Sequence, residues 1–139
     1  MPFAFGSTVF AFHEYNPFDF FEPRMIALER LTIGDYIQTP AGIDKITNIL
    51  TYDCPGGLAY LSTVFGLRAT ADVVINFGTT WREMNTVTPV VLQSCNGLVC
   101  IETELYNKIE VDGVQCITPH ILQADIENLE TSWRTTTGF

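Results

Sequence analysis

Basic residues are scarce in this chain. Its 139 residues include seven Lys and Arg against 16 Asp and Glu, which leaves a net charge of −9 at pH 7. Proteins that bind nucleic acid neutralise phosphates with clustered basic side chains, and an acidic surface is repelled by anionic membranes. The composition therefore predicts that the protein binds neither nucleic acid nor membranes.

Long apolar runs are missing as well. No stretch reaches the roughly 18 consecutive apolar residues that a membrane-spanning helix needs. The N-terminus lacks the basic start and the uninterrupted apolar core of a signal peptide, since Pro17 and Asp19 fall where that core would continue. We therefore expect a protein that is not secreted.

Cysteine is too sparse for a fold held by disulfides. A chain of this length can bury its own core without covalent cross-links. In the absence of an export signal, the cysteines are expected to be free thiols. They are Cys54, Cys95, Cys100 and Cys116.

The patterns that are present indicate an all-β domain. Short β-prone runs alternate with turn residues every eight to twelve positions. Asn96-Gly97 and Asp112-Gly113 are strong signals for two-residue hairpins. The predicted strands are Ser7–Phe12, Asp35–Thr39, Ile43–Tyr52, Leu58–Phe65, Leu67–Ala69, Val73–Phe77, Pro89–Cys95, Leu98–Glu104, Leu105–Val111 and Val114–Thr118.

Two segments have helical spacing. Ile26–Leu31 predicts a short helical turn, and a second helix near the C-terminus has Asp125 placed to cap it. The apolar positions of this second helix are Leu122, Ile126, Leu129 and Trp133. The predicted organisation is one β-domain over residues 1–125, followed by a short helix and a C-terminal tail over residues 126–139.

Four segments, in order, carry a resemblance to a known family. PFAFGSTV, from Pro2 to Val9, is similar to an opening Cys-Phe-Ala-x-Gly-Thr-x-Val; LERLTIGDYIQTPAGIDKITNI contains a fixed Gly-Asp pair; GLRATADVVI is similar to a block ending in Thr-x-x-His; and LYNKIEVDGVQCITPHIL is similar to a closing segment. On these segments the chain resembles the Hint superfamily, the domain shared by inteins and hedgehog autoprocessing proteins. The resemblance covers about residues 2–125 and implies a compact all-β fold.

The resemblance also shows where its chemistry would lie. In Hint domains a first-position Cys or Ser attacks the preceding carbonyl, a histidine protonates the leaving amine, and splicing ends with cyclisation of a terminal Asn. The nucleophile falls on Pro2, the histidine on Val73 and the closing His-Asn near Gln123–Asp125. Thr70 and Asp72 remain and are expected to cap a turn. Only Met1 precedes the first motif, so we expect no upstream protein to release. The sequence predicts a degenerate Hint domain that is not an enzyme.

Two alternatives stay open. The first is an autoproteolytic or thioester-forming domain that uses a displaced residue such as Ser7 or Cys116. The second is a small metal or ligand binder, suggested by Cys95-x4-Cys100 followed by Cys116-x3-His120. A hairpin at Asn96-Gly97 would place the first two thiols diagonally on flat strands, which disfavours zinc. We therefore expect no metal and no cofactor.

An aromatic segment is the most unusual feature of the sequence. Phe18, Phe20 and Phe21 lie close together in an apparent insertion bracketed by Pro17 and Pro23. Aromatic side chains on loops are typical anchors of protein interfaces. The predicted contact residues are Phe18, Phe20, Phe21, Trp133 and Phe139.

The predicted function follows from these features. We expect a non-catalytic Hint-like domain that serves as a structural or protein-interaction subunit of a larger assembly. Because free-standing Hint-like domains also occur in large DNA viruses, its concrete form would be a minor capsid protein. Its location would then be the virion or the cytoplasm.

Overall fold

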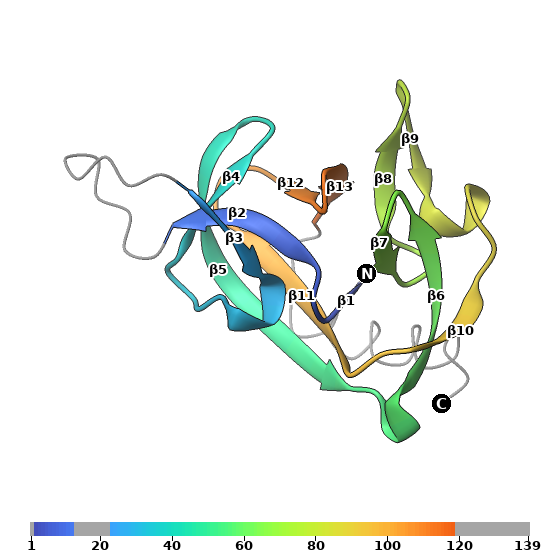
Figure 1. Ribbon diagram of the computed structural model, residues 1–139. Helices are drawn as coiled ribbons and strands as arrows, with labels where there is room; N and C mark the ends of the chain where they lie inside the picture. Colours follow the sequence, from blue (N-terminus) through green and yellow to red (C-terminus); the bar gives the residue numbers. More distant parts are fainter. Residues whose placement is uncertain (1, 13–22, 119–139) are drawn as a thin grey trace.

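A computed structural model describes residues 2–12 and 23–118, and within them the chain is built of antiparallel strands (Figure 1). The strands form one nine-stranded and one four-stranded sheet. No helix in the described part has the length and apolar character of a membrane span. The prediction of an all-β fold is confirmed. The predicted C-terminal helix and tail lie outside the described residues.

The nine-stranded sheet has the order β10-β6-β7-β1-β11-β5-β4-β2-β3. Its longest pair is β5 with β11, which cross the centre of the molecule side by side (Figure 1). The strands are β1 (Phe3–Ala4), β2 (Thr8–Phe12), β3 (Arg24–Ala27), β4 (Tyr36–Thr39), β5 (Gly42–Asp53), β6 (Leu58–Val64), β7 (Leu67–Ala69), β10 (Val91–Ser94) and β11 (Gly97–Thr103).

The four-stranded sheet has the order β12-β13-β8-β9. Its strands are β8 (Val74–Phe77), β9 (Thr80–Glu83), β12 (Lys108–Val111) and β13 (Val114–Ile117). Asp112 and Gly113 have φ values of 49° and 79°, the left-handed backbone that a two-residue hairpin requires. The hairpin predicted from this pair is confirmed, because β12 pairs with β13 on either side of it.

Three short 3-10 helices complete the described structure: η1 (Leu28–Arg30), η2 (Pro55–Gly57) and η3 (Met84–Thr86). The helical turn predicted over Ile26–Leu31 is therefore only partly correct. Ile26 belongs to β3 and pairs with Val9 of β2, so strand pairing overrides the local helical spacing there.

One apolar core draws side chains from both sheets. It extends from Val9 on β2 through Ile46 on β5 to Ile75 on β8 and Ile109 on β12, all essentially inaccessible to solvent. A second, smaller cluster includes Leu98 near the start of β11 and contains Ala4, Cys54, Ala59, Leu61, Cys95 and Leu98. The described strands thus bury their apolar side chains in two clusters.

The hairpin predicted at Asn96-Gly97 is wrong. β10 pairs with β6, whereas β11 pairs with β5 and β1. Gly97 lacks the positive φ of such a turn. It is a glycine for a different reason, because a Cβ there would lie 2.5 Å from the Phe5 ring. The pairing predicted between Cys95 and Leu98, and between Gln93 and Cys100, fails with it.

Other strands were shorter than predicted or were not predicted at all. The run Leu105–Val111 becomes strand only from Lys108, since the amides of Leu105 and Tyr106 donate to the Asp44 carboxylate, at 2.9 and 2.7 Å. Asp44 is buried, and these bonds turn the chain away from β11. The strands β1, β3 and β9 had no recognisable pattern in the sequence.

Asp112 joins the two sheets. Its Oδ1 accepts hydrogen bonds from the backbone amide and the hydroxyl of Thr8, at 2.9 and 3.0 Å, and its own amide donates to the Thr8 carbonyl at 2.9 Å. The turn of the β12–β13 hairpin is therefore fixed to the start of β2.

This contact can be separated from the turn itself. Asp112→Asn keeps an oxygen acceptor and tolerates positive φ, so its free energy of unfolding should stay within about 0.5 kcal/mol of the original. Asp112→Gly keeps only the backbone freedom and should lose about 1–2 kcal/mol, because the Thr8 amide then has no acceptor. Urea unfolding of both variants measures the difference. Equal losses in the two would contradict the proposed role of the oxygen.

Candidate functional site

The first described residue lies against the connection between β7 and β8. Pro2 is buried, and its carbonyl accepts a hydrogen bond from the Thr70 amide at 3.1 Å. β1 produces this contact, because Phe3 pairs with Val99 on one side and Ala69 on the other. The two segments to which the sequence resemblance assigns the nucleophile and the histidine therefore meet in space.

Thr70 organises this corner through its side chain as well. Its hydroxyl lies 2.7 Å from an Asp72 carboxylate oxygen and 3.4 Å from the Pro2 carbonyl. A hydroxyl has one proton, and the shorter contact to a carboxylate is the stronger one. The Thr70 carbonyl accepts from the Val73 amide at 3.2 Å. Thr70 and Asp72 thus form a turn, as the sequence predicted.

Val73 closes the corner from the core side. Its side chain is 0% exposed and belongs to the main apolar cluster. Its carbonyl accepts from the Met84 amide at 2.8 Å, which ties η3 to the same connection. An isopropyl group can neither donate nor accept a proton, so the Val73 side chain contributes packing alone.

The sequence analysis considered Cys100 only as a zinc ligand and did not place it near this corner. Cys100 lies on β11, next to Val99, the residue that pairs with Phe3. Burial raises its pKa to about 11, with a further rise from the nearby Asp72 charge. Only the pairing of β1 with β11 brings Cys100 here, and no local motif could have shown it.

The two displaced nucleophiles considered from the sequence are both buried. Ser7 is 5% exposed and lies in the turn between β1 and β2, where its carbonyl accepts from the Leu28 amide. Cys116 is fully buried on β13, and its thiol donates to the Val114 carbonyl at 3.3 Å. Burial raises the pKa of Cys116 to about 12. A thiol with that pKa is protonated at neutral pH and is a weak nucleophile.

The cysteines do not assemble as a zinc site would require. Cys95 packs with Cys54 in the small cluster, whereas Cys116 belongs to the main core. Among the described residues, no group of three or more His, Cys, Asp and Glu could hold a metal ion. All four cysteines are free thiols. His120, the fourth member of the considered zinc set, lies outside the described part.

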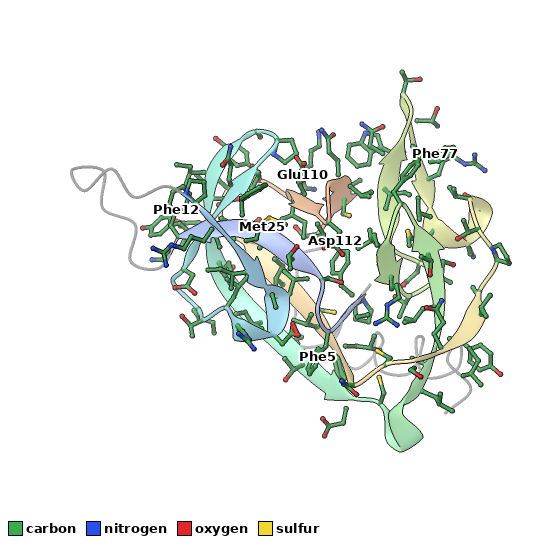
Figure 2. The ribbon with its side chains drawn as sticks, in the orientation of Figure 1. Phe5, Phe12, Met25, Phe77, Glu110 and Asp112 are labelled. Carbon is green, nitrogen blue, oxygen red and sulfur yellow. The ribbon has the colours of Figure 1, made fainter. Side chains whose placement is uncertain are left out.

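All five predicted contact residues, Phe18, Phe20, Phe21, Trp133 and Phe139, lie outside the described residues. The described surface beside residues 13–22 carries large apolar groups. Phe10 and Met25 are cross-strand neighbours on β2 and β3, and 46% and 54% of their surface is exposed. Phe12, the last residue of β2, is buried instead; Figure 2 labels both Phe12 and Met25.

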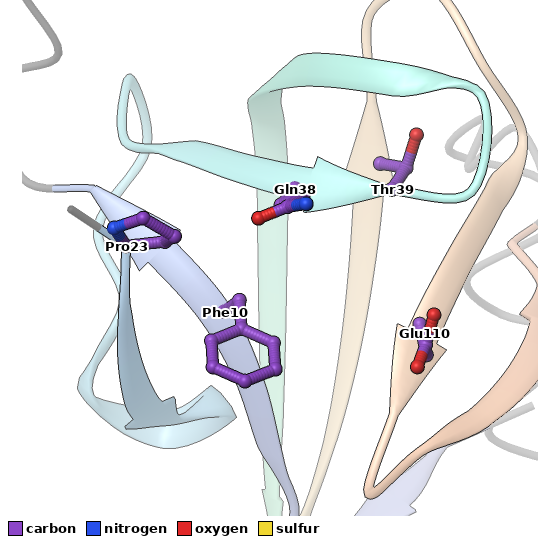
Figure 3. A pocket seen from close by; sticks show the side chains of 5 residues that line it. All are labelled: Phe10, Pro23, Gln38, Thr39 and Glu110. Atoms are coloured by element: carbon purple, nitrogen blue, oxygen red, sulfur yellow. The ribbon is translucent and has the colours of Figure 1, made fainter.

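A cavity adjoins this apolar pair. It has a volume of about 290 Å³ and lies between β2, β4, β12 and the start of β3 (Figure 3). Glu110 is its one charged lining residue. The full lining is Phe10, Pro23, Gln38, Thr39 and Glu110. The cavity therefore has an aromatic ring and a carboxylate in its lining.

Comparison with known proteins defines the fold. No family model and no curated protein matches the sequence. The solved structures that match include the gp41-1 intein, with a TM-score of 0.59, and a triply substituted variant of it, with a TM-score of 0.55. Each is 9% identical in sequence and covers 84% of this chain and 98% of its own.

The chain has an intein-like Hint fold. Because the identity is only 9%, the likeness extends to the fold and not to individual residues. The resemblance found in the sequence is confirmed at that level. In this chain the N-terminal strand lies beside the β7–β8 connection, where the Thr70 amide donates to the Pro2 carbonyl.

The raised pKa of Cys116 predicts how stability changes with pH. Above pH 9.0 the unfolded thiol ionises while the native thiol stays protonated up to about pH 12. The stabilising contribution is therefore complete below pH 9 and is lost as the pH rises, by about 1.4 kcal/mol per pH unit. The difference in free energy of unfolding between the original protein and Cys116→Ala should narrow at that rate between pH 9 and 11.

Urea unfolding at each pH measures this difference, and the pH 7–8 interval serves as the internal control because the difference should be constant there. A difference that stays constant up to pH 11 would show that Cys116 is not shielded from water.

Proposed function

We propose that this protein is a non-catalytic Hint-like domain that binds other proteins. The observation that supports it is the composition of the corner between β1 and the β7–β8 connection. Pro2 and Val73 fill that corner with buried apolar side chains, and the Pro2 carbonyl is held by the Thr70 amide. The intein-like fold supports the assignment of this corner as the position of Hint chemistry.

The chemistry of an acyl shift needs a donor for the oxyanion that forms at the carbonyl preceding the nucleophile. The Thr70 amide donates instead to the carbonyl of Pro2 itself. A nucleophile and a proton donor for the leaving amine are also required. Pro2 has no nucleophilic side chain and Val73 has no titratable group. On this proposal the missing catalytic residues make the domain degenerate.

A displaced nucleophile is the competing proposal. Ser7 and Cys116 are both buried, and neither has a described histidine beside it. The raised pKa values of Cys100 and Cys116 keep both thiols protonated at neutral pH. These features favour the inert domain over the autoproteolytic one.

The absence of autoprocessing is directly testable. Fused behind a reporter domain and incubated for a day with dithiothreitol or hydroxylamine, the protein should keep its intact mass. The same reporter without the domain controls for spontaneous hydrolysis. A reagent-dependent fragment that ends at or near residue 2 would contradict the proposal, and the new terminus would identify the displaced nucleophile.

The surface beside residues 13–22 is the proposed docking region. Phe10 and Met25 expose about half of their surface next to a cavity with an aromatic wall and one carboxylate. Exposed apolar neighbours of this kind are typical of interfaces. Phe18, Phe20 and Phe21 lie in the sequence between β2 and β3, the two strands that carry Phe10 and Met25.

A triple substitution distinguishes docking from packing. Replacing Phe18, Phe20 and Phe21 with Ser should leave the free energy of unfolding within about 1 kcal/mol while abolishing assembly, since each buried Phe contributes roughly 1.5–3 kcal/mol to binding. Urea unfolding and size-exclusion chromatography with light scattering measure the two effects. An unfolded variant would show that the rings belong to the core. A folded variant that still assembles would exclude this segment as the interface.

The larger setting of the domain follows from the resemblance. We extend the proposal to a structural subunit of a larger assembly, with Trp133 and Phe139 as further contacts. The particle of a large DNA virus stays the concrete prediction for that assembly, and the virion or cytoplasm for its location.

A further inference from the structure

A corner at one end of the nine-stranded sheet brings two cysteines together. Cys54 follows β5 and begins the turn of η2, whereas Cys95 lies between β10 and β11. The Gly57 amide donates to the Cys54 carbonyl, and the Cys95 amide donates to the Gly57 carbonyl, both at 2.9 Å. On the other side, Asp53 pairs with Gly97. Backbone contacts therefore fix both cysteines from two directions.

Their side chains share the small apolar cluster. Cys54 is 7% exposed and Cys95 is 3% exposed, and Ala4, Ala59, Leu61 and Leu98 surround them. The Cys95 thiol donates to the Gly97 carbonyl at 3.0 Å. Cys95 is also close enough to Cys54 to contribute to the raised pKa of the Cys54 thiol. The two cysteine side chains thus already share one apolar cluster in the reduced protein.

We propose that Cys54 and Cys95 form a reversible intramolecular disulfide on exposure to a low-molecular-weight disulfide such as glutathione disulfide. The site is selective because neither remaining cysteine belongs to this cluster. Cys100 lies further along β11, and the Cys116 thiol donates to the Val114 carbonyl in the main core.

The reaction needs two exchange steps. The Cys54 thiolate attacks one sulfur of glutathione disulfide, which forms a mixed disulfide and releases glutathione. The Cys95 thiolate then attacks the Cys54 sulfur, forms the protein disulfide and releases a second glutathione. The two protein thiols lose two electrons and two protons, and glutathione disulfide gains both.

Access to the site comes through the surface turn that covers it. Asp53, Pro55, Gly56, Gly57 and Leu58 are all exposed, although Cys54 between them is buried. Local opening of such a turn costs much less than global unfolding. Burial, followed by the hydrogen bond to Cys95, raises the pKa of Cys54 to about 12. The reaction should therefore be slow at neutral pH and accelerate as the pH rises.

The experiment treats the full-length, fully reduced protein with glutathione disulfide at pH 8.5. After blocking of free thiols, peptide mapping by mass spectrometry should find Cys54 linked to Cys95, with Cys100 and Cys116 blocked as free thiols. The oxidised protein should unfold at a temperature higher by about 5–15 °C, because the cross-link restricts the unfolded chain. Dithiothreitol should reverse both changes.

Cys54→Ser and Cys100→Ser provide a matched pair, since each removes one buried thiol. Cys100→Ser should still form the Cys54–Cys95 link, and Cys54→Ser should show no intramolecular link and no rise in unfolding temperature. Mapping of the original protein needs neither variant to fold. Four free thiols after oxidation, a stable mixed disulfide with glutathione, or a link to Cys100 or Cys116 would each overturn the proposal.

Discussion

A two-residue strand holds the large sheet together. β1 lies between β7 and β11, and Phe3 forms strand pairs with both Ala69 and Val99. Among the described strands, β10, β6 and β7 join the rest of the sheet only through β1. Phe3 is 2% exposed, and burial of a Phe contributes roughly 1.5–3 kcal/mol to folding. The arrangement of the two halves in Figure 1 therefore depends on the first few residues of the described chain.

The same strand explains why the corner between β1 and the β7–β8 connection suits apolar residues. A buried proline has no amide that needs an acceptor, so Pro2 can precede β1 without leaving a polar group unpaired. At Val73, which is 0% exposed, a charged histidine would lose its hydration. Chemistry at this corner would require groups that the packing disfavours. On the proposed function, Pro2 and Val73 stabilise the junction by apolar burial and contribute no reactive group.

The sequence predicted those parts of the fold that local chemistry determines. Asp112-Gly113 formed its hairpin because both residues adopt positive φ, a property of the dipeptide itself. Asn96-Gly97 did not form one. A glycine is needed at position 97 because a Cβ there would collide with the ring of Phe5, which is distant in sequence. β1 was missed since two residues carry no periodicity. The meeting of Pro2 with Thr70 depends on the pairing of β1 with β7, and the shared cluster of Cys54 and Cys95 depends on the pairing of β10 with β6. Both are pairings between distant segments, so no local pattern predicted them.

Ala4 links the β1 junction to the cluster that contains Cys54 and Cys95. It is the second residue of β1, pairs with Leu98, and packs in the cluster that contains Cys54 and Cys95. The proposed disulfide would therefore restrain the same junction that β1 maintains by pairing and burial. The proposed docking surface at Phe10 and Met25 lies on β2 and β3, at the opposite edge of the sheet from β10. Oxidation should consequently stiffen the junction without altering the proposed docking residues Phe10 and Met25, because the two regions share no described side-chain cluster.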